Sequence, residues 1–333
     1  MNQSWNTRML IISVIISLVV IGIIISGTLT KETFLYLFTL DPLIFLFAIL
    51  LHLVYWFAWA GRIKILSKSM EYRLGYLQSL NIVMVNVLAA SVTPSNAGGE
   101  PVRIKMLSDL GVRGGDATAI VISERVSDAL FFLILFPLLL IFFGLSLSGF
   151  LGYLLIAALI LLALLIITIG IIVWKHKNVE RFIEKFDSII RIFIRNRERR
   201  FRLIEKIKTE FRYFHNGMRI LILRRKMNFI IVMLLTATIW ISDFVIFSLV
   251  LLSMHQEPLW IYSIFAQIVI VLVSTIPISP GGSGLVEFVA ALLYGPFIRK
   301  DVIGIVILVW RFIVFYMNII VGLFFTLRHV VRK

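Results

Sequence analysis

The residues of this chain that are best suited to do chemistry are charged side chains that stand in otherwise apolar sequence. Both halves of the chain contain them, and several follow a Pro-Gly-rich interruption. Placing an Arg or Asp at the centre of a membrane helix costs about 2.5–3.5 kcal/mol on insertion scales, so such residues are functional candidates. The candidates are Glu100, Arg103, Glu124, Arg125 and Asp128 in the first half, and Asp243, Glu287 and Arg311 in the second.

The spacing of the first group favours ion pairing. Arg125 and Asp128 lie three residues apart and can pair on one helix, whereas Glu124 and Asp128 lie four apart and repel each other unless a cation stands between them. Arg103 or a bound cation could fill that place. The alternative for each charge is a structural ion pair between two helices, or a long side chain that reaches water at the interface, as Arg103, Lys105 and Glu124 could.

Arg311 favours a phosphate ligand. It follows Val309 and Trp310 about nine residues into an apolar run, which is roughly 14 Å along a helix and close to mid-bilayer. An arginine can hold a phosphate through two parallel hydrogen bonds, which suits an anionic headgroup better than a neutral solute.

Two Pro-Gly breaks interrupt the apolar sequence near residues 94–99 and 277–284. Irregular backbone at membrane depth is tolerated only where protein or a watery cavity satisfies its polar groups, and such breaks usually mark a transport site. Their glycines could expose N–H groups at half-helix ends, where the helix dipole favours an anion, or could simply let helices pack closely. The break residues expected in a translocation site are Thr93, Pro94, Asn96, Gly98, Gly99, Pro277, Gly281, Gly282 and Gly284.

Composition places the chain among all-α polytopic membrane proteins, because 60% of its 333 residues are hydrophobic and 15% are charged. The absence of Cys excludes disulfides and thiolate chemistry, and the five His show no metal-ligand spacing. No Gly-x-x-x-x-Gly-Lys phosphate loop occurs either. We therefore expect no metal, no cofactor and no nucleotide-driven pumping.

The elements that must position the charged residues are membrane helices. Charge then orients them, because basic residues at about 62–73, 175–226 and 328–333 favour the cytoplasmic side. The number of membrane crossings between these cytoplasmic segments places both termini in the cytoplasm. It also requires two broken or re-entrant hairpins, at about 75–107 and 259–298, which enter the membrane from opposite sides. The six predicted spans, each near the ~20 residues that a bilayer requires, lie at about 9–27, 41–60, 118–143, 149–174, 228–252 and 302–327.

Several residues of the first half have a match in the second half, and the matched residues are separated by nearly the same number of positions. This predicts an inverted-topology repeat within a single transmembrane domain, 1–333. The repeat units would be about 41–143 and 225–327, each reading helix, broken hairpin, helix. The alternative is a chance match, because Pro and Gly are frequent in membrane helices. The matched pairs, besides the two breaks themselves, are Trp56 with Trp240, Ser91 with Ser274 and Arg125 with Arg311.

The segment at about 175–226 carries 17 Lys or Arg against 6 Asp or Glu. Its apolar residues recur at helical spacing, which predicts two amphipathic helices lying on an anionic inner leaflet. So basic a run could also bind nucleic acid, but it contains no recognition motif and lies between two membrane spans, so we expect no nucleic-acid partner.

Particular motifs resemble a known family. They are Thr93-Pro94-Ser95-Asn96-Ala97-Gly98-Gly99-Glu100-Pro101-Val102-Arg103, then Glu124-Arg125 with Asp128, then Pro277 to Gly284 followed by Glu287, and a late Trp310-Arg311. The chain resembles the lysylphosphatidylglycerol synthase transmembrane-region family over essentially its entire length. The resemblance implies movement of a lipid between leaflets, its anionic or aminoacylated headgroup passing through a central cavity. The aminoacyl-transferase domain of the synthases is not found after the last span, so lipid lysylation is not expected.

The predicted function is that of a lipid flippase in the cell membrane rather than an enzyme, with anionic lipids as partners and a homo-oligomer or a lipid-modifying enzyme as further candidates. Proton coupling through Glu100, Glu124, Asp243 or Glu287 is an open hypothesis. The alternatives are a secondary transporter of a small anionic solute, a membrane partner of a lipid-linked glycosyltransferase, and a membrane-embedded enzyme that uses Glu124 and Asp128.

Overall fold

The computed structural model describes residues 38–94, 96–143 and 226–331, with single residues and short stretches between 160 and 216. The side chains of residues 136–143 and 329–331 are not among those described. The predicted spans at about 9–27 and 149–174, and most of the basic segment, lie outside the described residues. Regular structure in the described part is helical, and one isolated β-bridge joins Pro94 to Pro280.

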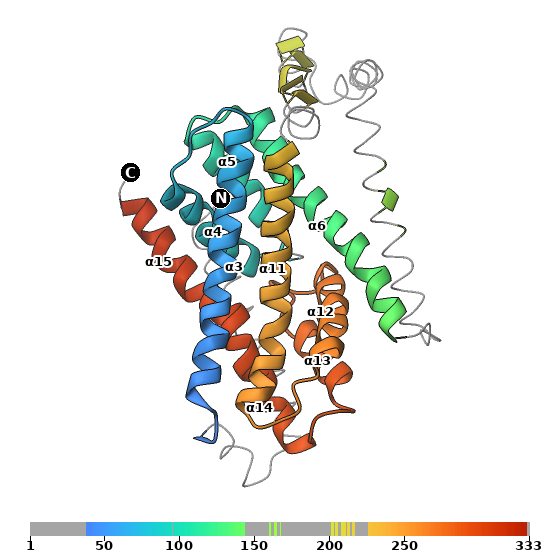
Figure 1. The fold of residues 1–333 in the computed structure, drawn as a ribbon. Coiled ribbons are helices and arrows are strands. Elements are labelled where there is room, and N and C mark those ends of the chain that lie inside the picture. Colours follow the sequence, from blue (N-terminus) through green and yellow to red (C-terminus); the bar gives the residue numbers. More distant parts are fainter. Residues whose placement is uncertain are drawn as a thin grey trace. The chain divides into compact units, whose positions relative to one another are not determined.

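The described helices agree with the predicted spans and broken hairpins in order and approximate bounds. A π-helical segment, Phe312–Tyr316, connects the last two of them. The helices are α3 (Pro42–Ser69), α4 (Tyr76–Ser91), α5 (Gly99–Asp109), α6 (Gly114–Phe143), α11 (Lys226–Ser253), α12 (Trp260–Ser274), α13 (Leu285–Tyr294), α14 (Lys300–Arg311) and α15 (Met317–Val331) (Figure 1).

Among the described residues, three helical stretches are long and apolar enough to cross a membrane: α3, α11 and Lys300–Arg328. The 28 residues of α3 and of α11 extend about 42 Å, more than the ~30 Å hydrocarbon core. They confirm helices over the predicted spans at 41–60, 228–252 and 302–327. The predicted end near residue 60 is wrong, however, because α3 continues to Ser69.

Both Pro-Gly breaks separate two short helices, as predicted. Residues 92–98 lie between α4 and α5, and residues 275–284 lie between α12 and α13. Three glycines of the second break, Gly281, Gly282 and Gly284, have φ values of 59°, 68° and 85°, a region that L side chains rarely adopt. The opposite orientation of the hairpins and their re-entrant path stay predictions.

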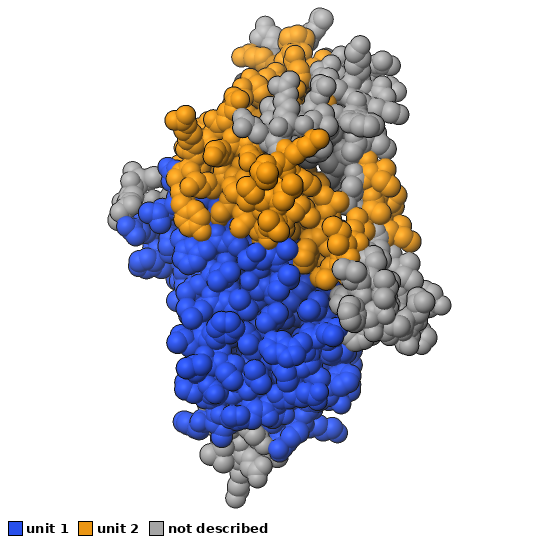
Figure 2. Space-filling view, viewed as in Figure 1, with its two compact units in different colours: residues 1–60, 77–102, 237–333 blue, residues 61–76, 103–236 orange. Residues whose placement is uncertain are grey.

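The chain divides into two compact units, each drawn from non-contiguous segments (Figure 2). Unit 1 comprises Met1–Ala60, Leu77–Val102 and Ala237–Lys333, and unit 2 comprises Gly61–Tyr76 and Arg103–Thr236. The boundaries fall within α3, α5 and α11, so these helices contribute residues to both units.

Aromatic side chains form the core of unit 1 around Phe247 of α11. Its ring stacks on that of Tyr294 in α13 at 3.7 Å between centroids, and it meets the ring of Trp310 in α14 at 5.4 Å. The Tyr262 hydroxyl of α12 donates to the Leu293 carbonyl at 2.6 Å. These contacts fix α11, α12, α13 and α14 against one another within the unit.

Candidate functional site

The two breaks touch each other within unit 1. The Gly281 N–H donates to the Thr93 carbonyl at 3.1 Å, next to the bridge between Pro94 and Pro280. A Cβ on Gly281 would lie 2.6 Å from the Ser91 carbonyl oxygen and 2.7 Å from Cε2 of Phe315. Only glycine therefore fits this crossing of two irregular segments.

Side-chain hydrogen bonds shape the first break. The Thr93 hydroxyl accepts from the Gly98 N–H at 2.8 Å and donates to the Ala89 carbonyl at 2.9 Å. A Cβ on Gly98 would lie 2.6 Å from Cγ2 of Thr93, and a Cβ on Gly99 would lie 2.4 Å from Oδ1 of Asn86. The Thr93 hydroxyl thus stabilises the turn, and a Cβ at Gly98 or Gly99 would displace the side chain of Thr93 or Asn86.

The glycine N–H groups of both breaks already donate within the protein. Gly98 and Gly281 bond to Thr93, Gly99 bonds to the Asn96 carbonyl, and Gly282 bonds to the Ser279 carbonyl. Buried backbone donors must be satisfied, which explains this use of them. An anion at these groups would have to replace existing hydrogen bonds.

A buried ion pair lies beside the second break. Arg311 Nε donates to Glu287 Oε1 at 2.7 Å, and the other carboxylate oxygen, Oε2, accepts from the Gly284 N–H at 2.7 Å. Glu287 is 0% and Arg311 4% exposed. The Arg311 guanidinium also lies 4.0 Å from the centroid of the Phe315 ring. Its Nη2 has no hydrogen-bond partner among the described residues.

The π-helical segment begins directly after Arg311 and carries Phe315. Such segments are rare and occur often at functional sites. Phe315 here joins two features, because its ring lies under Arg311 and also against the position that a Cβ on Gly281 would occupy. The ion pair and the crossing of the breaks therefore share one side chain.

Unit 2 contains a second buried group of charges. Arg62 donates to Glu124 Oε1 at 3.3 Å, to Asp128 Oδ1 at 2.6 Å and to the Thr236 hydroxyl at 3.1 Å. Arg103 donates to Glu124 Oε2 at 2.6 Å. Arg62 and Arg103 are each 1% exposed and Glu124 is 0% exposed. The cation expected between the two carboxylates is therefore Arg62, with Arg103 on the outer oxygen of Glu124.

Sequence analysis missed Arg62, because the span was expected to end before it. The structure extends α3 by two more turns, and the two carboxylates that neutralise Arg62 lie 62 and 66 residues away in the chain. The predicted pair of Arg125 with Asp128 is present at 3.4 Å, although the Arg125 side chain is 39% exposed. Arg125 therefore lies at the margin of this group.

The remaining predicted residues are placed differently. Asp243 lies in α11, partly exposed, with no hydrogen bond or ion pair to any described residue. Glu100 is partly buried at the start of α5, and Asn96 and Pro277 are exposed at the breaks. Within the described ranges no group of three or more His, Asp or Glu could hold a metal ion.

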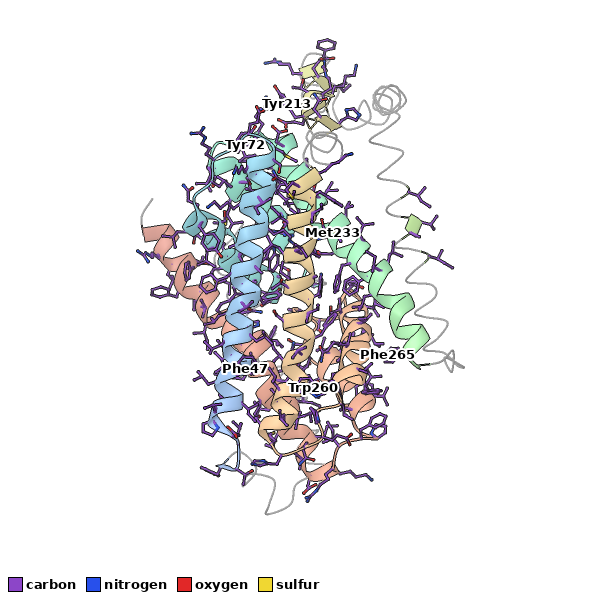
Figure 3. The ribbon with its side chains drawn as sticks, in the orientation of Figure 1. Phe47, Tyr72, Tyr213, Met233, Trp260 and Phe265 are labelled. Carbon is purple, nitrogen blue, oxygen red and sulfur yellow. The ribbon has the colours of Figure 1, made fainter. Side chains whose placement is uncertain are left out.

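A further cluster lies at the start of α6, also in unit 2. The Tyr72 hydroxyl (labelled in Figure 3) donates to Asp116 Oδ2 at 2.7 Å and accepts from Arg113 Nε at 2.9 Å. Burial raises the pKa of the Tyr72 hydroxyl, and the hydrogen bond to Tyr72 raises the pKa of Arg113. The Arg113 guanidinium lies 4.2 Å from the centroid of the Tyr213 ring. Tyr213, which belongs to the basic segment at about 175–226, therefore contacts the residue that precedes α6.

The fold and the buried charges define this chain as a helical membrane protein with polar centres at helix breaks. Residues 10–322 match the family described as the lysylphosphatidylglycerol synthase TM region. A relative described as a UPF0104 membrane protein, from Archaeoglobus fulgidus, is 34% identical over 313 residues, which cover 93% of this chain and 94% of the relative. The chain belongs to the lysylphosphatidylglycerol synthase transmembrane-region family, as the motifs predicted.

Proposed function

We propose that this protein moves a phosphate-bearing lipid between the leaflets of the cell membrane. The observation that carries the proposal is the buried Arg311, paired with Glu287 at a helix break and retaining one donor without an acceptor among the described residues. A phospholipid, an aminoacyl-phospholipid and a polyprenyl phosphate all present the phosphate that this group would recognise. The family description supports the membrane lipid context.

The pair is suited to exchange its carboxylate for a phosphate. A buried ion pair gains little net stability, because the desolvation of both charges offsets their attraction. A phosphate arriving at Arg311 could take two parallel hydrogen bonds from the guanidinium, replacing Glu287 on Nε and using the spare Nη2. Glu287 would then lose its hydrogen bond from Arg311 Nε, so ligand binding would loosen the start of α13.

The buried charges of unit 2 repeat a feature of the Arg311–Glu287 pair. In each hairpin the half-helix after the break is joined to the next helix by an arginine–carboxylate pair, Arg103 with Glu124 and Glu287 with Arg311. We infer that the hairpins belong to the two halves of an inverted-topology repeat, each half with its own buried ion pair.

Reconstituted protein tests the proposal. Proteoliposomes would receive headgroup-labelled phosphatidylglycerol, lysyl-phosphatidylglycerol or polyprenyl phosphate, and a quencher would report the labelled lipid left in the outer leaflet. Arg311→Gln should slow movement of the preferred lipid about 10- to 100-fold, as expected for loss of charge-assisted hydrogen bonds. Arg311→Lys keeps the charge but loses the planar pair of donors, and should recover only part of the rate.

Arg299→Gln is the matched control, because Arg299 lies at the start of the same helix with its side chain 59% exposed and paired to Asp301. It should move lipid at the parental rate. Equal rates for Arg311→Gln and Arg299→Gln would refute the phosphate assignment. Uptake of free glycerol phosphate without any lipid movement would instead identify a transporter of small anionic solutes.

We propose further that the protein catalyses no reaction. We also propose that both termini lie in the cytoplasm, because the distribution of basic residues favours that orientation. Cysteines introduced one at a time near residues 64 and 257, in a chain without native Cys, allow labelling of intact cells with an impermeant maleimide. Labelling at residue 257 alone supports this orientation, and labelling at 64 alone reverses it.

A further inference from the structure

Asp243 is the one acidic residue of α11. It is the eighteenth of 28 residues, which places it about 15 Å from the C-terminal end of the helix and close to mid-membrane. No described residue pairs with it or donates to it. A carboxylate at that depth is costly in its charged form.

The helical spacing places Asp243 on the inward face of α11. The exposed residues Ile230, Leu234 and Ile241 recur at four and seven residues and mark one face. Asp243 lies two residues beyond Ile241, which is about 200° round the helix. It shares its side with Phe247, which is 0% exposed and lies in the aromatic core of unit 1.

The exposure of Asp243 differs from that of its neighbours on this face. Ile239, Phe247 and Val250 are 3%, 0% and 0% exposed, whereas Asp243 is partly exposed. We infer that water reaches Asp243 from this inward side of the helix. Water supplies the path by which a proton arrives and leaves.

The buried carboxylates in the described helices are held by arginine. Glu287 is paired with Arg311, and Glu124 with Arg62 and Arg103. Asp243 differs from these groups, because no described residue is paired with it. Phe247 of α11 is in ring contact with α13 and α14, whose titratable groups are Glu287 and Tyr294, and Lys300, Asp301 and Arg311. Helix α3 also contacts α11 at its start, through the hydrogen bond from the Asp41 N–H to the Ser253 carbonyl, and its buried titratable group in unit 1 is His52.

We propose that Asp243 takes up one proton for each anionic lipid that binds, so that proton and lipid move across the membrane in the same direction. The step forms one O–H bond on the carboxylate with a proton from water on one side, and breaks it by release to water on the other. Protonation removes one negative charge from the interior of unit 1 and so favours a phosphate at Arg311. Linkage is reciprocal, so bound lipid favours the protonated acid equally.

The inference rests on the proposed lipid movement, so its test has a readout that does not depend on transport. Infrared spectra of the reconstituted protein would be recorded across neutral pH to detect the carbonyl stretch of a protonated carboxylic acid. The band should be present in the parent and in Glu257→Gln, a variant of an exposed carboxylate outside the helices. It should be lost in Asp243→Asn, and shifted but retained in Asp243→Glu, which shows that the variants fold.

The transport readout uses the same proteoliposomes with an imposed pH gradient. One coupled proton per lipid supports at most about tenfold accumulation of lipid in one leaflet for each pH unit. The parent should approach this ratio, whereas Asp243→Asn should still move lipid but equilibrate it regardless of the gradient.

Three outcomes separate the two proposals. Lipid movement in the parent without accumulation overturns the proton coupling and leaves lipid translocation intact. Accumulation in Asp243→Asn equal to the parent shows that another residue carries the proton and also overturns it. No lipid movement in any variant overturns the proposed function, and absence of an Asp243-dependent infrared band then refutes the proton site independently.

Discussion

Replacing Gly281 with Ala should disturb both the fold and lipid movement, because this glycine stands where the two breaks meet. Its φ of 59° costs an L residue roughly 1–2 kcal/mol. The new methyl group would lie 2.6 Å from the Ser91 carbonyl oxygen and 2.7 Å from the Phe315 ring, well inside van der Waals contact. Overpacking of one methyl group typically costs about 1–3 kcal/mol. The expected loss of unfolding free energy is therefore about 2–5 kcal/mol.

Gly111 provides a matched control, since its φ of 89° is also positive and a Cβ there would meet nothing within 4 Å. Gly111→Ala should show the backbone cost alone, roughly 1–2 kcal/mol. The difference between the two variants then isolates the close approach of the breaks. Unfolding in mixed micelles, followed by tryptophan fluorescence, measures both losses in the same detergent.

Gly281→Ala should also slow lipid movement in the fraction of protein that is still folded. The Phe315 ring, which the methyl group would displace, lies 4.0 Å from the Arg311 guanidinium, so the arginine would shift with it. We expect folded Gly281→Ala to move lipid at least about tenfold more slowly than the parent, as for the loss of one charge-assisted hydrogen bond. If Gly281→Ala is no less stable than Gly111→Ala and transports normally, the two breaks do not meet closely enough to exclude a methyl group.

Three further changes test unit 2. Arg62→Gln should lower the free energy of unfolding by about 3–5 kcal/mol, because it removes the arginine that Glu124 and Asp128 share. Adding Asp128→Asn should recover part of this loss in the same unfolding assay. Gly115→Ala should release the surface segment to limited proteolysis, since the new Cβ would lie 2.2 Å from the Glu210 carbonyl oxygen; unchanged cleavage would show that the segment is not held there. The pKa of Tyr72 is raised above 10.0, so its stabilising hydrogen bond is present below pH 10 and lost as pH rises through the folded value; Tyr72→Phe should therefore lose less thermal stability than the parent above pH 10.

The helices and breaks could be predicted from sequence because their signals are local. Apolar runs of bilayer length and Pro-Gly interruptions each act within a few residues. The extension of α3 through Arg62 could not be predicted, since its cause is distant. The helix tolerates a buried arginine there only because Glu124 and Asp128 reach it from α6.

The use of the break glycines shows a similar limit. Sequence indicates that glycines adopt unusual backbone angles and approach other groups closely, but not which carbonyl their N–H groups will find. Gly281 bonds to Thr93, which belongs to the other half of the chain. That partner follows from the meeting of two hairpins, which no local pattern encodes.

The buried charge pairs bear on how the proposed internal repeat should be aligned. The matched landmark Arg125 is 39% exposed on its side chain, whereas Arg311 is buried against Glu287. In the repeat proposed above, the counterpart of Arg311 is Glu124 and that of Glu287 is Arg103, at separations close to those of the landmark pairs. A buried pair requires one charge of each sign but not a fixed order, so two related halves can exchange the signs and keep the pair. A charge-reversed variant, Arg103→Glu with Glu124→Arg, should therefore fold better than either single change, and equal instability of all three would contradict this equivalence.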